Sequence, residues 1–356
     1  MARIRELQAL KHPESPAVLV SPSAAPQAPA KPVQVVCMAT RPWMDRHVCP
    51  VAHAGGWPLV GAPDARVREA LVVVASVADE RAAMAAGAAG TVLMEHGAGL
   101  HYDDPTLPAD SAWRGGRGHG RGRQLFLSPG QALARAHRRA HPGVPAAAVG
   151  APSLDAWHPV GLKHAPAQPR RPIVCVSTHW DCRILPELRS SWSWLEPQLA
   201  ALAADPRWEV WGHWHPHDEA TGEAGRRRQF YAATGIRAVS SWEEVLRHAS
   251  LFITDNSSTL YEFAASGRPV VALNPPWYRR EVRHGLRFWD AVPGIQHSDL
   301  SGPLAGTVAA ALDDAPDIRA IRERAVAAAY GRVDGKAAER AARAIRRRFR
   351  ELITAP

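Results

Sequence analysis

The chain has few cysteines and no long apolar run. Four cysteines occur in 356 residues, and no two of them form a CxxC pair: Cys37, Cys49, Cys175 and Cys182. This usage indicates a reducing compartment and argues against a disulfide framework or a structural zinc site. The longest apolar run, residues 71–78, is far shorter than the roughly 20 residues that a membrane-spanning helix needs. With no recognisable secretory signal, the sequence predicts a protein of the cytoplasm that is either soluble or peripheral to the membrane.

The sequence does have enough apolar residues for packed cores, and an excess of positive charge. Hydrophobic residues make up 46% of the chain, and its length fits two domains of ordinary size. The net charge is +9, which favours anionic partners such as phosphates, polyanions, nucleic acid or acidic lipid. Much of this charge lies in residues 114–123 and after residue 335. Residues 1–32 mix charged residues with a Ser/Pro/Ala-rich stretch, which predicts a flexible leader.

Short β-branched runs alternate with Ala-rich helical stretches along the rest of the chain. The runs predict strands at residues 33–39, 71–75, 91–94, 125–127 and 146–149, then at 173–177, 208–211, near 236, 251–254 and 270–273. The stretches predict helices at residues 79–86, 129–140, 192–203, 242–247, 259–266, 317–330 and 336–354. Such alternation is typical of parallel sheets that are covered by helices on both faces.

A Pro-rich segment, residues 164–172, separates the two series of strands and reads as a linker. The sequence therefore predicts an α/β protein of two doubly wound, Rossmann-like domains, residues 33–163 and 173–335, facing each other across a cleft. In such sheets the ligand lies beyond the carboxyl ends of the strands. Residues 336–356 form a basic C-terminal helix, which could pack back on the first domain.

The most informative segment is residues 251–274. An apolar strand ends at an Asp-Asn-Ser-Ser sequence, and a helix begins at about Thr259. Ser257 and Ser258 add hydroxyl groups at the start of this helix, where unpaired N–H groups and the positive end of the dipole favour a phosphate. Glu262 lies one helical turn after Ser258 and can reach a hydroxyl group of a ribose or of a donor. The segment thus predicts a donor-phosphate site.

Asp255 and Ser258 are also common helix caps, and for these side chains taken alone that alternative stays open. The complete pattern of strand, Asp-x-Ser-Ser, helix, Gly-x-Pro and strand is more specific. It resembles the donor-binding signature of the CDP-glycerol glycerophosphotransferases, the bacterial teichoic-acid polymerase and primase family. That family has Asp-Tyr-Ser-Ser with an acidic residue four positions on, whereas this chain has Asn256 in place of the Tyr and Glu262 in place of the Asp. The resemblance implies a GT-B fold and contacts from Asp255, Ser257, Ser258, Thr259 and Glu262 to the donor.

A second motif follows the strand at residues 91–94. Glu95, His96 and Gly97 come directly after this strand, and Gly99 follows. A histidine at the edge of a cleft can act as a general base on an acceptor hydroxyl, and the glycines allow a substrate to approach closely. A lone histidine at a strand end is also a common structural residue. The motif resembles the family's Trp-His-Gly-Thr element, which implies that His96 is the base, although the basic residues that normally follow it are absent.

Three histidines at alternate positions, His213, His215 and His217, follow the strand at 208–211. In an extended chain they would share one face, but no nearby Cys or HExxH pattern supports a metal, so we predict no metal and no cofactor. The family carries a His-Pro element here that helps to hold the donor phosphates, and His215 is the matching residue. The loop after residues 173–177 also faces the predicted cleft, which makes Thr178 and His179 candidate phosphate or acceptor contacts.

Two basic segments remain open to several interpretations. Residues 114–123 resemble an RGG-type segment, but the segment is short and single, so a basic lip of the cleft or a solvated loop is as good an explanation and nucleic acid is an improbable partner. The basic helix at 336–356 could be solvated or could rest on anionic lipid at the inner face of the membrane, since the family works at the membrane surface.

These observations predict an enzyme that moves a glycerophosphate or related polyol phosphate from a CDP-activated donor to an acceptor hydroxyl, which could be lipid-linked. His96 would take the proton, while Ser257, Ser258 and His215 would neutralise the leaving nucleotide phosphate. A looser form of the same pattern occurs in UDP-N-acetylglucosamine 2-epimerases and other GT-B enzymes. Two alternatives therefore stay open: an enzyme acting on an NDP-sugar, either a glycosyltransferase or an epimerase, and a non-catalytic protein that binds nucleotides or polyanions.

Overall fold

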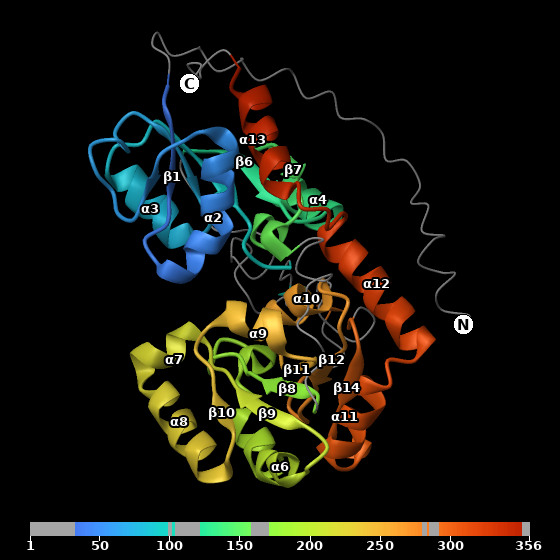
Figure 1. Ribbon diagram of the computed structural model, residues 1–356. Helices are drawn as coiled ribbons and strands as arrows, with labels where there is room; N and C mark the ends of the chain where they lie inside the picture. The colour runs from blue at the N-terminus through green and yellow to red at the C-terminus, as the bar shows by residue number, and fades with distance from the viewer. Residues whose placement is uncertain are drawn as a thin grey trace.

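The computed structural model describes residues 33–98, 102–103, 122–157, 171–279, 283–284 and 292–350. Within them the chain forms two parallel sheets of six strands each, one above the other in Figure 1. The predicted leader, Gly99, most of the basic segment at 114–123, most of the linker and the last residues of the basic tail lie outside the described residues. The predicted α/β, GT-B-like fold class is confirmed by these two sheets.

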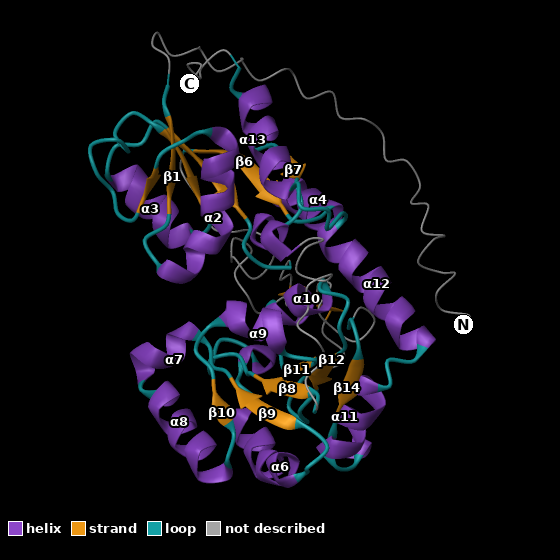
Figure 2. Ribbon diagram, viewed as in Figure 1, coloured by secondary structure: helices purple, strands orange, loops and turns teal. Residues whose placement is uncertain are grey.

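The first sheet has the strand order β2-β1-β3-β4-β6-β7. Its strands are β1 (Val35–Met38), β2 (Leu59–Val60), β3 (Leu71–Val74), β4 (Gly90–Met94), β6 (Arg123–Ser128) and β7 (Ala146–Ala148). Most of the side chains of the four central strands are buried on both faces, as parallel sheets require when helices cover them. Figure 2 shows these helices on either side of the strands.

The second sheet has the order β10-β9-β8-β11-β12-β14. Its strands are β8 (Ile173–Val176), β9 (Glu209–Gly212), β10 (Arg237–Ala238), β11 (Leu251–Thr254), β12 (Val270–Leu273) and β14 (Ile295–His297). The order reverses between β8 and β11, so the loops that follow these two strands start on opposite sides of the topological switch point, where doubly wound sheets bind ligands.

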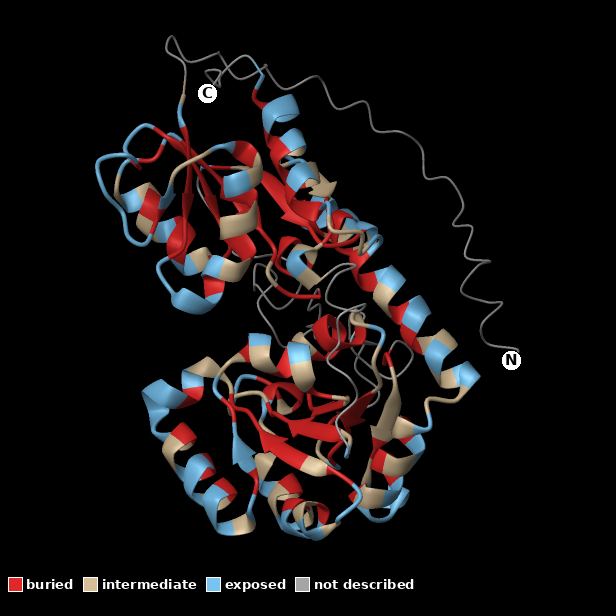
Figure 3. Cartoon of the chain, viewed as in Figure 1, coloured by how far each residue is buried: buried red, intermediate tan, exposed pale blue. Residues whose placement is uncertain are grey.

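Helices cover both sheets. In chain order they are α2 (Pro42–Gly55), α3 (Val77–Ala85), α4 (Gln131–Ala140), α6 (Trp192–Ala204), α7 (Pro216–Thr221), α8 (Glu223–Thr234), α9 (Trp242–His248), α10 (Thr259–Ala264), α11 (Leu304–Leu312), α12 (Pro316–Tyr330) and α13 (Ala337–Arg348). Short 3₁₀ turns lie at Pro152–Trp157, Pro186–Leu188 and Asp299–Ser301. Figure 3 shows that the central strands of both sheets are buried while the outer faces of the helices are exposed. Among the described residues, no helix is both long and apolar enough to cross a bilayer.

Several elements differ from the prediction. The sequence pattern did not predict α2, because Pro50 interrupts it and the strongest helix formers are scarce. This helix forms because it buries one face, including Met44, Val48 and Val51, in the core of the first domain. The short strand expected near residue 236 is confirmed as β10, and the segment that leads into it, Tyr231 to Gly235, is the end of α8 and its cap.

The end of the chain joins the two domains. Helix α12 leaves the second domain and packs on both α10 and α4, and α13 then lies along α2 (Figure 1). Ala338, Ala341, Ile345 and Phe349 of this last segment belong to the same apolar cluster as the strands of the first sheet. A further link is the short antiparallel pair of β5 (Tyr102–Asp103) and β13 (Arg283–His284), one strand from each half of the chain.

The packing of α4 against α12 generates a prediction about Gly130, which precedes α4. A Cβ atom at this position would lie 2.3 Å from the carbonyl oxygen of Ala329 in α12, so the two helices would have to separate. We expect Gly130→Ala to destabilise the protein by about 1–3 kcal/mol, measured as the shift of the urea-unfolding midpoint. Gly143→Ala is the matched control, because no heavy atom lies within 4 Å of a Cβ there. Equal midpoints for the two variants would contradict the prediction.

Candidate active site

The loop after β11 is held in place by Asp255, whose side chain is buried. One carboxylate oxygen accepts a hydrogen bond from the backbone N–H of His179 (2.7 Å). The other accepts from the backbone N–H (2.9 Å) and the hydroxyl group (3.0 Å) of Ser191. Asp255 therefore ties the loop after β11 to the loop after β8 and to the start of α6, and it positions the neighbouring serines.

The two serines differ in their surroundings. The hydroxyl oxygen of Ser257 accepts hydrogen bonds from the hydroxyl group of Thr259 (2.7 Å) and from its N–H (3.4 Å). Ser258 occupies the cap position of α10, but its own backbone is already helical and its side chain makes no capping hydrogen bond. The alternative of ordinary helix caps is therefore wrong for Ser258 and for Asp255, whose carboxylate serves other loops.

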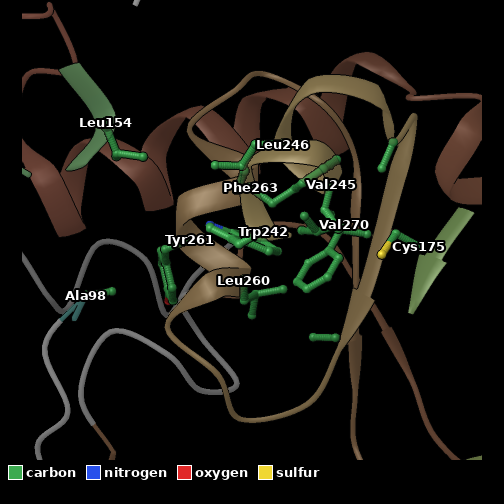
Figure 4. Packing of buried hydrophobic residues seen from close by; sticks show 14 of the residues in the cluster. Ala98, Leu154, Cys175, Trp242, Val245, Leu246, Leu260, Tyr261, Phe263 and Val270 are labelled. Carbon is green, nitrogen blue, oxygen red and sulfur yellow. The ribbon is translucent and has the colours of Figure 1, made fainter. Parts of the chain in front are cut away.

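The segment after β4 meets Ser258 from the opposite domain. A Cβ atom at Gly97 would lie 2.8 Å from the Ser258 hydroxyl oxygen, so only glycine fits here without a shift of that side chain. Ala98 is completely buried in the apolar cluster of the second domain, and Figure 4 shows it on the side of Tyr261 of α10. The structure thus brings together two motifs that lie about 160 positions apart in the sequence, a spacing typical of a site built between two domains.

His96 is oriented by the first domain. Its Nδ1 lies 2.6 Å from the carbonyl oxygen of Ala75. Since a carbonyl group only accepts, Nδ1 carries the proton, and the lone pair of the neutral imidazole is on Nε2. The ring of His47, from α2, meets His96 edge-on with 5.8 Å between the ring centroids. Burial, helped by the nearby Arg46 and His96, holds the pKa of His47 well below its ordinary value.

Glu95 is buried at the same strand end. One of its carboxylate oxygens lies 3.9 Å from Nε2 of His137 in α4, and the other would be 3.8 Å from a Cβ atom at Gly97. The ring of His137 stacks on Phe126, and its Nδ1 lies 3.0 Å from the hydroxyl oxygen of Ser128. The carboxylate of Glu95 therefore lies between the core of the first domain and the glycine that meets Ser258.

Glu262 receives two donors, one from each domain. Its Oε2 accepts a hydrogen bond from the indole N–H of Trp242 (3.0 Å) and pairs with the guanidinium of Arg46 from α2. The guanidinium also lies 6.0 Å from the centroid of the Trp242 ring. Glu262 is thus close to the cleft, as a donor contact requires, but its carboxylate is engaged in an ion pair between the domains.

The three histidines after β9 do not share a face, because the chain turns into α7 at His215. The imidazole of His213 is buried, with its Nδ1 3.0 Å from the hydroxyl oxygen of Ser177. Nδ1 of His215 accepts from the backbone N–H of His217 (3.1 Å) and caps α7. The side chain of His217 is exposed and meets the edge of Trp180. Among the described residues, no group of three His, Cys, Asp or Glu side chains is arranged to hold a metal ion.

Burial keeps two of these histidines neutral. It lowers the pKa of His213 to about 4, with a smaller effect from the positive charges of Arg227 and Arg46. Burial likewise lowers the pKa of His215 to about 2, and the neighbouring histidines, His179 first, add to the effect. Because Nδ1 of His215 accepts a hydrogen bond, its proton is on Nε2. His215 is therefore a neutral hydrogen-bond donor at physiological pH, so of the two contributions expected from it, hydrogen bonding and charge, only hydrogen bonding is available.

Thr178 and His179 lie beside this loop. The hydroxyl group of Thr178 is buried and lies 2.9 Å from that of Ser190, while the ring of His179 lies 5.2 Å from the ring of His215. Below them is Arg227 of α8, with 3% of its surface exposed. Its guanidinium lies 3.3 Å from Asp218 and 4.9 Å from the centroid of the Trp192 ring.

Sequence reasoning missed Arg46, Trp242 and Arg227. Arg46 had one usable signal, because it lies in the first turns after β1, at the carboxyl edge of a parallel sheet. Trp242 stands at the start of a predicted helix with no feature that marks it as a partner of Glu262. Arg227 is one of three consecutive arginines, and the sequence does not show which of them is buried.

Two doubly wound sheets with a candidate site where their loops meet are the arrangement of the GT-B fold. A model of the family described as CDP-Glycerol:Poly(glycerophosphate) glycerophosphotransferase matches residues 199–347. This match confirms the predicted resemblance to that family, and the two sheets confirm the GT-B-like fold. No curated protein sequence matches the chain.

Solved structures with a similar fold have little sequence in common with this chain. The wall teichoic acid polymerase TagF is 14% identical over 90% of each chain, with a TM-score of 0.58. MnaA of S. aureus, in a co-structure with UDP, is 14% identical over 91% of this chain and 98% of its own, with a TM-score of 0.57. A protein of Listeria monocytogenes described as a UDP-N-acetylglucosamine 2-epimerase is 15% identical over 90% of this chain and 97% of its own, with a TM-score of 0.56.

The depressed pKa of His213 predicts how stability depends on pH. Between about 6.5, the ordinary value, and about 4, the unfolded chain binds a proton that the folded chain does not. Stability is therefore fully present above this window and is lost as the pH falls through it. We expect His213→Gln to make the decline of the free energy of unfolding between pH 7 and 4 shallower by roughly one proton.

The measurement is the urea-unfolding midpoint at a series of pH values. Val245→Ala is the control, because it removes buried apolar atoms without removing a titrating group. It should lower the midpoint at every pH and leave the slope unchanged. The prediction is contradicted if His213→Gln lowers the midpoint by the same amount at every pH, as the control variant is expected to do.

Proposed function

We propose that the chain transfers a polyol phosphate, such as glycerol phosphate, from a CDP-activated donor to an acceptor hydroxyl in the cleft between its two domains. The observation that carries the proposal is the close approach of Gly97, which follows His96, to the side chain of Ser258. It joins a residue suited to general-base catalysis with hydroxyl groups suited to a phosphate. The CDP donor is supported by the match to the glycerophosphotransferase family.

In the proposed reaction, the acceptor oxygen attacks the phosphorus that carries the polyol. A new O–P bond forms, the bond to the bridging oxygen of the diphosphate breaks, and CMP leaves. Nε2 of His96 accepts the proton of the acceptor hydroxyl, and the hydrogen bond from Nδ1 to Ala75 stabilises the imidazolium that results. The donor occupies the second domain and the acceptor the first, with Glu95, Gly97 and Gly99 on the acceptor side.

The donor phosphates are held by hydrogen bonds from the loops of the second domain. Ser257, Ser258 and Thr259 offer hydroxyl groups, and His215 offers its Nε2–H as a neutral donor. Fixed donors of this kind stabilise the charge that develops on a leaving phosphate without reorganising. Thr178 and Glu262 are further donor contacts in this proposal. Asp255 acts as a positioning residue, because its oxygens bind the neighbouring loops.

An enzyme acting on a UDP-sugar is the competing proposal, since MnaA in its UDP co-structure has a similar fold. A thermal-shift panel of CDP-glycerol, CDP, UDP-sugars and GDP-sugars separates the two. Stabilisation by the cytidine compounds alone supports the glycerophosphotransferase, whereas stabilisation by UDP compounds alone overturns it. A protein that binds a nucleotide but consumes no donor with any acceptor would be the non-catalytic alternative.

The role of His96 predicts separate effects on turnover and binding. We expect His96→Ala to lower kcat by about 10²- to 10⁴-fold while the Kd for CDP changes by less than about threefold, because the base acts only on the acceptor. Steady-state kinetics and calorimetry measure the two quantities. His96→Asn keeps a donor for the carbonyl group of Ala75 and should be equally inactive. His53→Ala, an exposed histidine of α2, is the control and should be active.

We also propose that α13 rests on anionic membrane. Its arginines Arg343, Arg346, Arg347 and Arg348 are exposed, which leaves their charges available to lipid headgroups. Replacement of Arg347 and Arg348 by Glu should reduce co-sedimentation with phosphatidylglycerol vesicles, and added salt should reduce that of the wild-type protein. The same double replacement at Arg226 and Arg228 of α8 changes the charge equally and should have little effect. Equal losses for both pairs would show a response to net charge alone.

A further inference from the structure

Arg46 is the residue by which the first domain reaches the donor side of the cleft. Helix α2 begins just after β1, at the carboxyl edge of the first sheet, and Arg46 lies in its second turn. From there its guanidinium pairs with Glu262 of α10 and lies 6.0 Å from the centroid of the Trp242 ring. Both partners belong to the second domain, so this side chain spans the interface.

Among the described residues, most of the hydrogen-bonding capacity of Arg46 has no acceptor. Within the described part of the chain, its side chain donates only to Glu262, through Nη2. A guanidinium has five N–H donors in a planar fork, and a phosphate group can accept two of them at once. The side chain is 19% exposed, so a ligand in the cleft can reach it, whereas the carboxylate of Glu262 is 6% exposed.

The position of Arg46 is also central to the site. Its positive charge contributes to the low pKa of His47, which is next to it in the chain and touches His96. It contributes in the same way for His213, on the second domain. The charge of Arg46 therefore lowers the pKa of a histidine in each of the two domains. The neutral imidazoles of His213 and His215 leave the charge of a bound phosphate to be balanced by another group.

We propose that Arg46 is a phosphate-binding residue that exchanges partners when the donor binds. The guanidinium leaves Glu262 and takes the phosphate oxygens in a bidentate contact. Glu262 keeps the hydrogen bond from Trp242 and becomes an acceptor for a hydroxyl group of the donor. The inference rests on the proposed function only in that the cleft must accept a nucleoside phosphate.

The exchange explains why an acidic residue lies beside an anion site. A carboxylate that merely lined the site would repel the phosphate. Paired with Arg46, Glu262 instead holds the guanidinium at the cleft before the ligand arrives, which reduces the side-chain entropy lost on binding. After the exchange the guanidinium is paired with the phosphate, and the carboxylate of Glu262 is stabilised by the hydrogen bonds from Trp242 and from the donor hydroxyl.

The test is calorimetric titration of the full-length protein with CDP, UDP and pyrophosphate. We expect Arg46→Ala to weaken binding of the nucleotide that the wild-type protein prefers by roughly 10- to 100-fold. It should also reduce the dependence of log Kd on salt concentration. Glu262→Gln removes the competing charge but keeps the side-chain volume, and it should bind pyrophosphate as tightly as the wild-type protein or more tightly. Arg226→Ala, an exposed arginine on α8, is the control for net charge.

The outcomes separate this inference from the proposed function. An ion pair that only clamps the domains together predicts equal losses of affinity for Arg46→Ala and Glu262→Gln, and that result would overturn the exchange. Wild-type affinity in Arg46→Ala would do the same while leaving the transferase proposal intact. A preference for UDP over CDP would reject the proposed donor, but Arg46 would still be tested with UDP. If the wild-type protein binds no nucleoside phosphate, both proposals fail.

Discussion

The site depends on one close contact between the domains, in which the backbone at Gly97 touches the side chain of Ser258. No other residue type fits there without moving that side chain, because a Cβ atom would lie 2.8 Å from the serine oxygen. The next residue, Ala98, is buried in the core of the opposite domain. The loop that carries His96 is therefore anchored at both ends, by β4 on one side and by the second domain on the other. A change in the angle between the domains would move His96 relative to the serines.

The electrostatics of the cleft follow from burial. His213 and His215 are kept neutral by the loss of water around them, so they act as fixed dipoles with defined donor and acceptor nitrogens. Formal charge is concentrated in pairs, such as Arg46 with Glu262 and Arg227 with Asp218. A cleft of this kind is preorganised, because the orientation of each donor is fixed by a neighbour that can be named.

The sequence was most informative where structure is set by short-range pattern. The segment from β11 to β12 was predicted closely, because strand, turn and helix there follow directly from apolar runs and a Ser-Ser sequence. The prediction from sequence failed where burial determines the secondary structure. An example is α2, which is stabilised partly by packing against α13, nearly 300 positions later in the chain. Arg46 and Trp242 could not be predicted as site residues for the same reason, because they become partners of Glu262 only through contacts between distant segments. The site residues and the domain boundaries that the sequence proposed stay predictions, although the structure brings His96, Gly97 and Ser258 to one place.

The return of α13 to the first domain has a consequence for how the chain is made. The helix fills an apolar groove beside α2, but the ribosome finishes it only after the whole second domain. At ordinary rates of synthesis, the groove stays uncovered for roughly 10 to 40 seconds after the last strand of the first sheet emerges. During that time the nascent first domain exposes the apolar residues that α13 later covers. Chaperones or a slow collapse of the first domain would then have to protect these residues from aggregation. A protein truncated before α13 would remain in that immature state permanently.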